Sequence, residues 1–204
     1  GEMPKIGETF AALGKNSKYA SGVLAQVLYV GGQIMCWTYI YQYAEGIGMD
    51  SVTAGYYQMA AFVLFTVGRA IGTYLLRFFS SGKLLMYFAV FAMVFSLGTI
   101  FIQGIIGLYC LVGISFFMSL MFPTIYGIAL SGLSEEQSKL GSAGLVMAIV
   151  GGALMPKLQG IIIDAGGNGV ADTSIMGVSE VNFSFILPLL CFSFIAWYGF
   201  TVFK

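Results

Sequence analysis

A long run without any charged residue constrains this chain more than any other feature. No Asp, Glu, Lys or Arg occurs between Gly104 and Ser134. Because an α-helix rises about 1.5 Å per residue, roughly 20 apolar residues span the hydrocarbon core of a bilayer, and this run is long enough. Only 9% of the 204 residues are charged, against about 25% in soluble domains. The sequence therefore predicts an all-α membrane protein.

Composition also excludes several classes of function. The formal net charge is zero, which gives no indication of a nucleic-acid partner, and the absence of histidine excludes a His-based triad or zinc site. The cysteines, Cys36, Cys110 and Cys191, lie in apolar runs typical of small buried side chains rather than of disulfides or metal clusters. No nucleophile–base pair occurs in any apolar run, so we expect neither an enzyme nor a metal or organic cofactor.

Six apolar stretches predict six transmembrane helices, at about 18–44, 51–76, 84–101, 105–133, 140–163 and 181–203. Residues 1–17 mix charged and apolar side chains, which predicts a cytoplasmic amphipathic linker segment ahead of a transmembrane domain over 18–204. The chain starts at Gly1 without an initiator methionine. We therefore expect a fragment or a processed piece of a longer protein.

The loops predict the orientation in the bilayer. An even number of spans puts both termini on one side, and Lys and Arg gather in cytoplasmic loops. Seven cations fall on the side of the termini: Lys5, Lys15, Lys18, Arg77, Lys83, Lys139 and Lys204. The opposite loops carry acids and no cation: Glu45, Asp50, Asp164, Asp172 and Glu180. Both termini are thus predicted to be cytoplasmic, and the two groups of three spans form the inverted repeat found in secondary transporters.

Polar groups recur within the uncharged run. Ser115, Ser119, Phe122 and Tyr126 follow at helical spacing and share one face, beside Pro123. A proline inside a helix frees a backbone carbonyl, which a membrane protein tolerates only where protein or a wet cavity satisfies it. The pattern suits the wall of a pathway for a neutral, hydroxyl-rich solute. Close helix packing through small hydroxyl residues explains it equally well.

A second stripe lies on the first span and contains Gln26, Tyr29 or Val30, Gln33, Trp37 and Tyr41. An amide both donates to and accepts from sugar hydroxyls, and an aromatic ring offers an apolar face to the sugar's C–H groups. For Gln33 and Trp37, a position facing a cavity is favoured. For Gln26 and Tyr41, nearer the ends of the span, interhelical hydrogen bonding or an aromatic belt is favoured.

Two cations lie inside spans. Arg69 needs a partner, a carbonyl or a route to the surface, so gating or structural support is favoured over substrate contact. Lys157 lies near the outer end, where its stem either reaches the surface or faces the cavity to bind an anion or an acid. The Gly- and Asp-rich stretch 164–172 matches no calcium or phosphate motif and is predicted as an exposed turn.

Several segments resemble one transporter family. The segment at 118–126, MSLMFPTIY, resembles the tenth helix of the fucose–galactose–glucose:proton symporters of the major facilitator superfamily. Further colinear matches include 29–33 followed by Cys36 and Trp37, as well as Gly68-Arg69, 83–85 and 164–167. The resemblance covers nearly the whole chain and implies its C-terminal six-helix half. Met118, where hexose members commonly have Asn, resembles the L-fucose permeases of the family.

The resemblance implies import of a monosaccharide, L-fucose first, with a proton as coupling ion and no cofactor, in the bacterial cytoplasmic membrane. The implied partners are the lipid bilayer and an N-terminal six-helix half. The predicted sugar-binding residues are Tyr29, Gln33, Trp37, Ser119, Phe122 and Tyr126, and the predicted gating or structural residues are Arg69, Pro123 and Lys157. All nine acids fall at termini or loops, so the coupling carboxylates are predicted in the other half. The alternatives are a glucose, galactose or anionic sugar transporter, with the anion held by Lys157, and a non-transporting scaffold.

Overall fold

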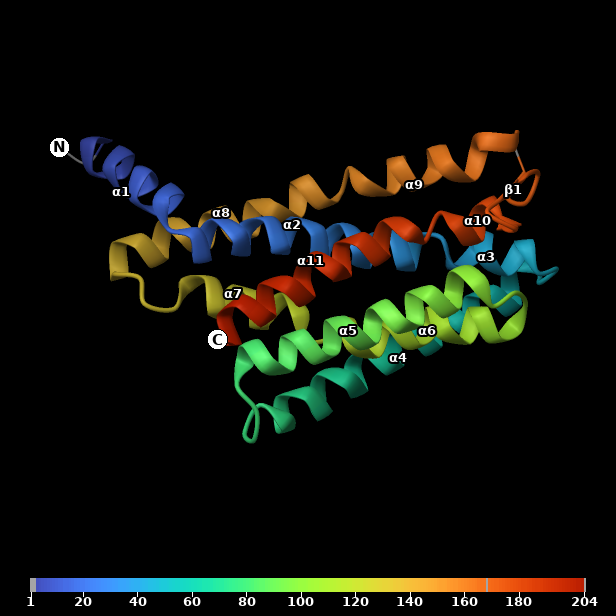
Figure 1. The fold of residues 1–204 in the computed structure, drawn as a ribbon, viewed down its shortest axis with the longest axis horizontal. Coiled ribbons are helices and arrows are strands. Elements are labelled where there is room, and N and C mark those ends of the chain that lie inside the picture. Colours follow the sequence, from blue (N-terminus) through green and yellow to red (C-terminus); the bar gives the residue numbers. More distant parts are fainter. Residues whose placement is uncertain (1–2, 168, 204) are drawn as a thin grey trace.

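The computed structural model describes residues 3–167 and 169–203, with side chains from residue 6 to residue 202 apart from residue 168. The chain is an elongated bundle in which most helices lie along one axis (Figure 1). Its longer helices are α1 (Met3–Lys15), α2 (Ser17–Thr38), α4 (Ser51–Leu75), α5 (Ser81–Phe101), α6 (Ile105–Met118), α8 (Glu135–Gly152) and α11 (Ile186–Phe203). The shorter ones are α3 (Ile40–Gly46), α7 (Met121–Leu130), α9 (Met155–Ile163) and α10 (Glu180–Phe183).

These helices group into spans long and apolar enough to cross a membrane. Five helical stretches qualify within the described residues, and the bent pair α2–α3 makes a sixth. The pairs α6–α7, α8–α9 and α10–α11 each continue one such stretch past a short irregular step. Figure 1 places α1 and the end of α11 at one end of the bundle and the β1 hairpin at the other. The stretches correspond to the six segments that hydropathy predicts.

The first span differs from the continuous helix predicted over 18–44. It bends by 42° between α2 and α3, at Tyr39, whose backbone leaves helical geometry with φ −99° and ψ 14°. No proline lies here. The Tyr39 hydroxyl donates to the Pro156 carbonyl of α9 at 2.7 Å. A contact between segments far apart in the sequence therefore accompanies the bend.

Proline chemistry explains the step between α6 and α7. Pro123 has no N–H to donate to the carbonyl four residues earlier, and its ring crowds that carbonyl. That carbonyl belongs to Ser119, and α6 ends at Met118, directly before it. Helix α7 begins two residues after Ser119. The uncharged run is thus one span with a break one turn before its proline.

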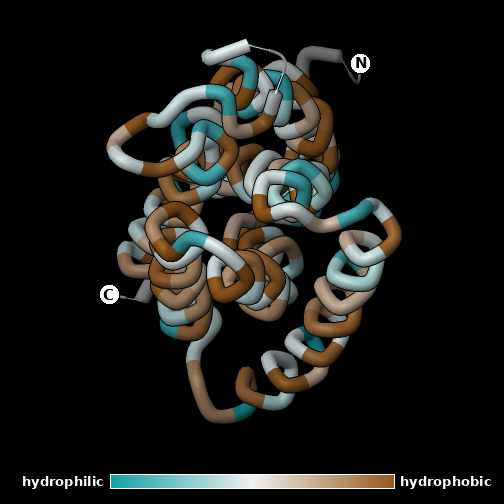
Figure 2. The backbone as a smooth tube through the Cα atoms, turned by 90° about the vertical axis from the view of Figure 1, so that its right-hand side faces the viewer, coloured by the Kyte–Doolittle hydropathy of each residue, from teal (hydrophilic) through white to brown (hydrophobic). Residues whose placement is uncertain are grey.

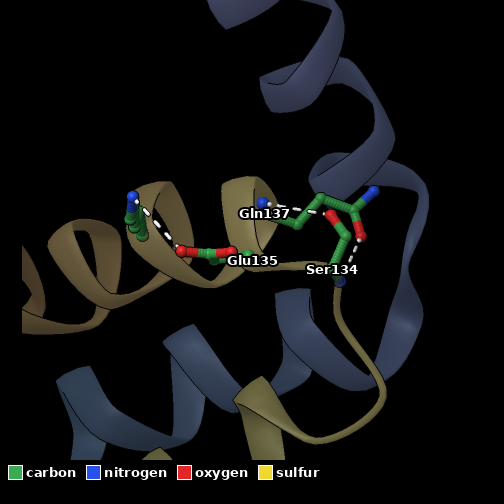
Figure 3. A network of polar contacts seen from close by, with 4 residues as sticks. Ser134, Glu135 and Gln137 are labelled. Atoms are coloured by element: carbon green, nitrogen blue, oxygen red, sulfur yellow. Dashed lines mark hydrogen bonds and ion pairs between the residues drawn. The ribbon is translucent and has the colours of Figure 1, made fainter.

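Side-chain caps begin several helices. Asp50 accepts from the Thr53 N–H, Ser80 from the Lys83 N–H and Ser134 from the Gln137 N–H. At α8 the Gln137 side chain also accepts from the Ser134 N–H, forming a capping box (Figure 3). The hydrogen bonds from Thr53 hold the pKa of the exposed Asp50 carboxyl below its usual value. These caps satisfy helix N–H groups where the chain turns at the ends of spans.

Burial is uneven across the bundle. Of the 18 most apolar consecutive residues in each span, 56% are buried in α6–α7 and 17% in α4. Hydrophobic residues, brown in Figure 2, recur along the helices. Among the described residues, large apolar side chains such as Met59, Val63 and Val150 are more than 60% exposed. The span α6–α7 is therefore the centre of this fold, and α4 lies at its margin.

The described residues of 164–172 are mostly exposed, as the predicted turn requires, and the segment that follows holds them in place. A one-turn 3-10 helix (Asp164–Gly166) leads to a hairpin of β1 (Ser174–Ile175) and β2 (Val178–Ser179), in which Ser174 pairs with Ser179. Glu180, fully buried, accepts from the N–H groups of Gly166 and Asp172, each at 2.9 Å. Its carboxylate fixes the loop at the start of α10, a role that loop composition does not predict.

Candidate substrate-facing surface

The two stripes expected from the sequence meet in the structure. Trp37 Nε1 donates to Ser115 Oγ at 3.0 Å, which joins α2 to α6. The rings of Tyr29 and Phe122 lie 6.2 Å apart, and Phe122 stacks on Tyr126 at 6.4 Å with planes 16° apart. We call the face formed by Gln33, Trp37, Phe122 and Tyr126 the polar–aromatic face. The hydrogen bond of Trp37 and the ring contact of Phe122 connect α2 to the α6–α7 span at this face.

The six predicted sugar-binding residues do not have equal access. Gln33, Trp37, Phe122 and Tyr126 are partly exposed. Tyr29 is 1% exposed and Ser119 fully buried. The Ser119 hydroxyl donates to the Phe116 carbonyl at 2.6 Å. Packing therefore occupies Tyr29 and Ser119, and the other four present surface to a solute.

The two glutamines of α2 behave differently. Gln26 is fully buried, and its Nε2 donates to the Phe122 carbonyl at 3.4 Å while its Oε1 has no partner. The side chain of Gln33, two turns along the same face, makes no hydrogen bond within the part of the chain that the structure describes. Gln26 therefore packs between helices, and Gln33 offers a free donor and acceptor.

Trp37 is held at a fixed angle. Its ring meets Phe62 and Phe65 of α4 edge-on, at centroid distances of 4.9 and 5.2 Å. Together with the hydrogen bond to Ser115, these contacts connect α2, α4 and α6. Phe62 and Phe65 are not predicted from the sequence, because α4 carries apolar residues on nearly every side and its periodicity does not single them out.

Arg69 reaches the break in the α6–α7 span. Its Nε donates to the Ser119 carbonyl at 3.1 Å, and its guanidinium carbon lies 5.1 Å from the centre of the Phe65 ring. Gly68 allows this approach, because a methyl group there would collide with the Phe116 carbonyl and Ser119 Oγ. Arg69 itself is exposed in this chain rather than buried. The Ser119 carbonyl thus supplies the hydrogen-bond partner that an arginine inside an apolar span needs.

The remaining residues named from the sequence are not members of the polar–aromatic face. Lys157 is exposed on α9, with no ion pair or hydrogen bond among the residues that the structure describes. Tyr41 lies beyond the bend, on α3, and is 42% exposed. Pro123 lines a small cavity with Leu120, Thr124 and Thr73. Lys204, counted above for orientation, falls outside the described residues.

Two further glutamines, which the sequence analysis does not single out, also lie partly exposed on helices. Gln42 on α3 and Gln58 on α4 are partly exposed, yet the Oε1 atom of each is buried without a partner. A polar amide inside an apolar span is itself the signal that could have found them. No group of three or more acids or cysteines that could hold a metal occurs in residues 3–167 and 169–203.

Comparison with known proteins gives the sequence context. The chain is 54% identical over 192 residues to the L-fucose-proton symporter of Haemophilus influenzae, covering 94% of this chain and 43% of the relative. It is 36% identical to the L-fucose-proton symporter of Escherichia coli, covering 85% and 37%. The glucose/galactose transporter of Brucella abortus is 30% identical, covering 87% and 40%. No family model matches the chain.

A solved structure gives the same fold. The crystal structure of a major facilitator superfamily transporter, FucP, in the outward conformation superposes with a TM-score of 0.84 and 32% identity, covering 96% of this chain and 45% of that one. The predicted all-α membrane fold, one half of a major facilitator superfamily transporter, is confirmed. Within that superfamily the chain belongs to the fucose permease family, as the sequence resemblance predicts. It spans less than half the length of these relatives.

Proposed function

We propose that this chain is the C-terminal half of a transporter that imports a monosaccharide with a proton by alternating access, and that its sugar is L-fucose. The polar–aromatic face, on which α2 and α6–α7 meet, carries the proposal. The names of the relatives at 54% and 36% identity, both L-fucose-proton symporters, support the choice of sugar. The three relatives compared above are all named as symporters or transporters, which argues against an enzymatic function for this chain.

The chemistry of the face suits a neutral sugar. Gln33 brings an amide that no described residue engages, so it can donate to one hydroxyl and accept from another. Trp37, Phe122 and Tyr126 present ring surface for the apolar side of a pyranose. The face includes no Lys, Arg, Asp or Glu. None of these four side chains offers a counter-ion to a charged substrate.

The proton site belongs, in this proposal, to the other half of the transporter. A coupling group must gain and lose a proton as the cavity alternates, which suits a carboxylate desolvated in the membrane. Of the acids that the structure describes, only Glu180 is buried, and two loop N–H groups already engage its carboxylate. The face itself carries no acid. The N-terminal half is therefore proposed as both partner and proton acceptor.

The proposed location is the bacterial cytoplasmic membrane, with both termini inside. The support is the charge bias of the loops, since Lys and Arg concentrate on the cytoplasmic side of bacterial membrane proteins. Among the described residues, the cations at the N-terminus and in the loops on the same side include Lys15, Lys18, Arg77, Lys83 and Lys139. In Figure 1 α1, the start of α8 and the end of α11 lie toward the same end of the bundle.

Uptake by the full-length transporter tests the proposal. Cells lacking their own sugar permeases should accumulate labelled L-fucose, and a protonophore should abolish the accumulation while leaving exchange intact. Excess unlabelled glucose or galactose should not compete. The Brucella abortus relative, named a glucose/galactose transporter, makes those hexoses the second candidate. Competition by them would favour that candidate, and failure of every sugar would leave the scaffold alternative.

A further inference from the structure

A cavity away from the polar–aromatic face lies at the end of the bundle that holds α1. It has a volume of ≈ 580 Å³ and lies between the start of α2, the residue that follows α7 and the end of α11. Its polar lining includes Ser17, Lys18, Ser21, Ser131 and Thr201. None of its described lining residues is acidic. A polar, positively charged cavity within a membrane protein calls for an anionic occupant.

The cation of this cavity is held in place. Lys18 Nζ donates to the Ser131 carbonyl at 2.5 Å and to Ser131 Oγ at 2.7 Å. An ammonium group has three N–H donors, so one remains for a ligand. The Tyr198 hydroxyl donates to the Lys18 carbonyl at 3.0 Å, which ties α11 to the same residue. The positive charge therefore has a fixed position.

Further donors stand beside that charge. Ser17 and Ser21 lie one turn apart on one face of α2, and neither hydroxyl makes a hydrogen bond within residues 3–167 and 169–203. Ser17 is also the first residue of a 22-residue helix, whose N-terminus carries a partial positive charge. An ammonium, two free hydroxyls and a helix N-terminus together match the oxygens of a phosphate.

An exposed apolar stripe on α11 runs beside this cavity. On α11, Leu190, Trp197 and Phe200 follow at helical spacing and are 59%, 51% and 42% exposed. Trp197 also lines the cavity. Tryptophan concentrates at membrane–water interfaces, where one edge meets head groups and the ring meets acyl chains. The stripe provides a surface for acyl chains beside a site for a head group.

We propose that this cavity binds the phosphate of an anionic phospholipid, with Lys18 as its main cationic contact and Ser17 and Ser21 as hydrogen-bond donors. Basic pockets between transmembrane helices on the cytoplasmic side are a known setting for anionic head groups. A soluble phosphate would meet the same donors, but the exposed stripe on α11 favours a ligand with acyl chains. The proposal is independent of which sugar is transported.

Spin-labelled lipids test the proposal on the full-length transporter in nanodiscs. Electron spin resonance measures how strongly the protein retains phosphatidylglycerol relative to phosphatidylcholine. Lys18→Gln should lower this selectivity by more than the roughly fivefold that any basic group near an anionic surface contributes, because it also removes the charged donor inside the cavity. Lys18→Arg should retain it. Lys15→Gln removes an exposed lysine that does not line the cavity, so it measures the surface contribution alone and should lower the selectivity clearly less than Lys18→Gln.

A double serine variant and a competition with inorganic phosphate complete the test. The double variant Ser17→Ala, Ser21→Ala keeps the lysine and its bonds to Ser131, so its loss of selectivity would support the site even if Lys18→Gln fails to fold. Equal selectivity in the wild type, the double variant and Lys18→Gln would overturn the proposal. So would displacement of phosphatidylglycerol by inorganic phosphate beyond a chloride control of equal ionic strength, since the site would then be for soluble phosphate.

Discussion

Arg69 of α4 donates a hydrogen bond from its Nε to the Ser119 carbonyl, 3.1 Å away, where the α6–α7 span breaks. Ser119 precedes Pro123 by four residues, so in an unbroken helix the missing N–H of the proline would be its donor. The arginine supplies the donor that the proline lacks. Arginine and proline are each unfavourable inside a transmembrane helix. Here the arginine donates to the one carbonyl oxygen that the proline leaves without a donor.

The first prediction tests that coupling. Arg69→Leu leaves the Ser119 carbonyl without its donor, and an unsatisfied buried acceptor costs about 1–3 kcal/mol. Pro123→Ala restores an N–H that can take over, so Arg69→Leu should cost much less in the Pro123→Ala background. Thermal unfolding of the full-length transporter in detergent gives the double-mutant cycle. Arg77→Leu, at an exposed position just after α4, is the matched control. Additive effects at positions 69 and 123 would contradict the coupling.

The second prediction separates sugar contact from helix packing. Gln33→Ala should weaken L-fucose binding a few-fold to tenfold, the cost of about 0.5–1.5 kcal/mol for a lost neutral hydrogen bond, with an unchanged unfolding temperature. Gln26→Ala should lower the unfolding temperature, because Gln26 is buried against Phe122. Isothermal titration and thermal unfolding of both variants measure the difference. Unchanged affinity in Gln33→Ala would remove Gln33 from the site.

The third prediction concerns orientation. The native Cys36 and Cys191 are buried and Cys110 is partly buried, so labelling by an impermeant thiol reagent should start from a low background. A cysteine at the exposed Thr173 should react when the reagent is applied outside intact cells. One at the exposed Glu136 should react only after the cells are opened. The reverse pattern would invert the topology.

The fourth prediction concerns the outer loop. Glu180→Gln exchanges a carboxylate acceptor for a neutral one, and hydrogen bonds to charged groups are roughly twice as strong as neutral ones. Hydrogen exchange should accelerate at the N–H groups of Gly166 and Asp172, which bond to Glu180. Asp164→Asn, an exposed change in the same loop, should leave those rates unaltered. Equal protection in both variants would show that the carboxylate does not hold the loop.

Hydropathy predicts long apolar stretches that are helical in the structure, because a bilayer demands long apolar helices whatever their contacts. The stretch predicted at 51–76 is a helix over Ser51–Leu75. The bend at Tyr39 was not predictable, since it carries no proline and accompanies a contact with Pro156, 117 residues away. Steps of this kind depend on tertiary contacts rather than on local sequence.

The sequence predicts which types of residue line the polar–aromatic face, but not which of them are exposed. Helical spacing placed Tyr29, Gln33 and Trp37 on one side of α2, and spacing alone cannot show which of them a neighbouring helix covers. The structure covers Tyr29 with Phe122 and leaves Gln33 open. Glu180 escaped prediction for the same reason, because its partners lie in a loop whose path the sequence does not reveal.

The pairing of Arg69 with Ser119 also sets an order of events during biosynthesis. The two residues lie 50 positions apart, so at roughly 5–20 residues per second Ser119 leaves the ribosome several seconds after Arg69. An arginine without a partner costs about 2.5–3.5 kcal/mol on insertion at the centre of an apolar helix, which is an upper value for Arg69, six residues before the end of α4. We therefore expect α4 to stay displaced toward the nearer membrane interface, with Arg69 in the head groups, until the nascent α6–α7 span arrives and draws it to its final depth.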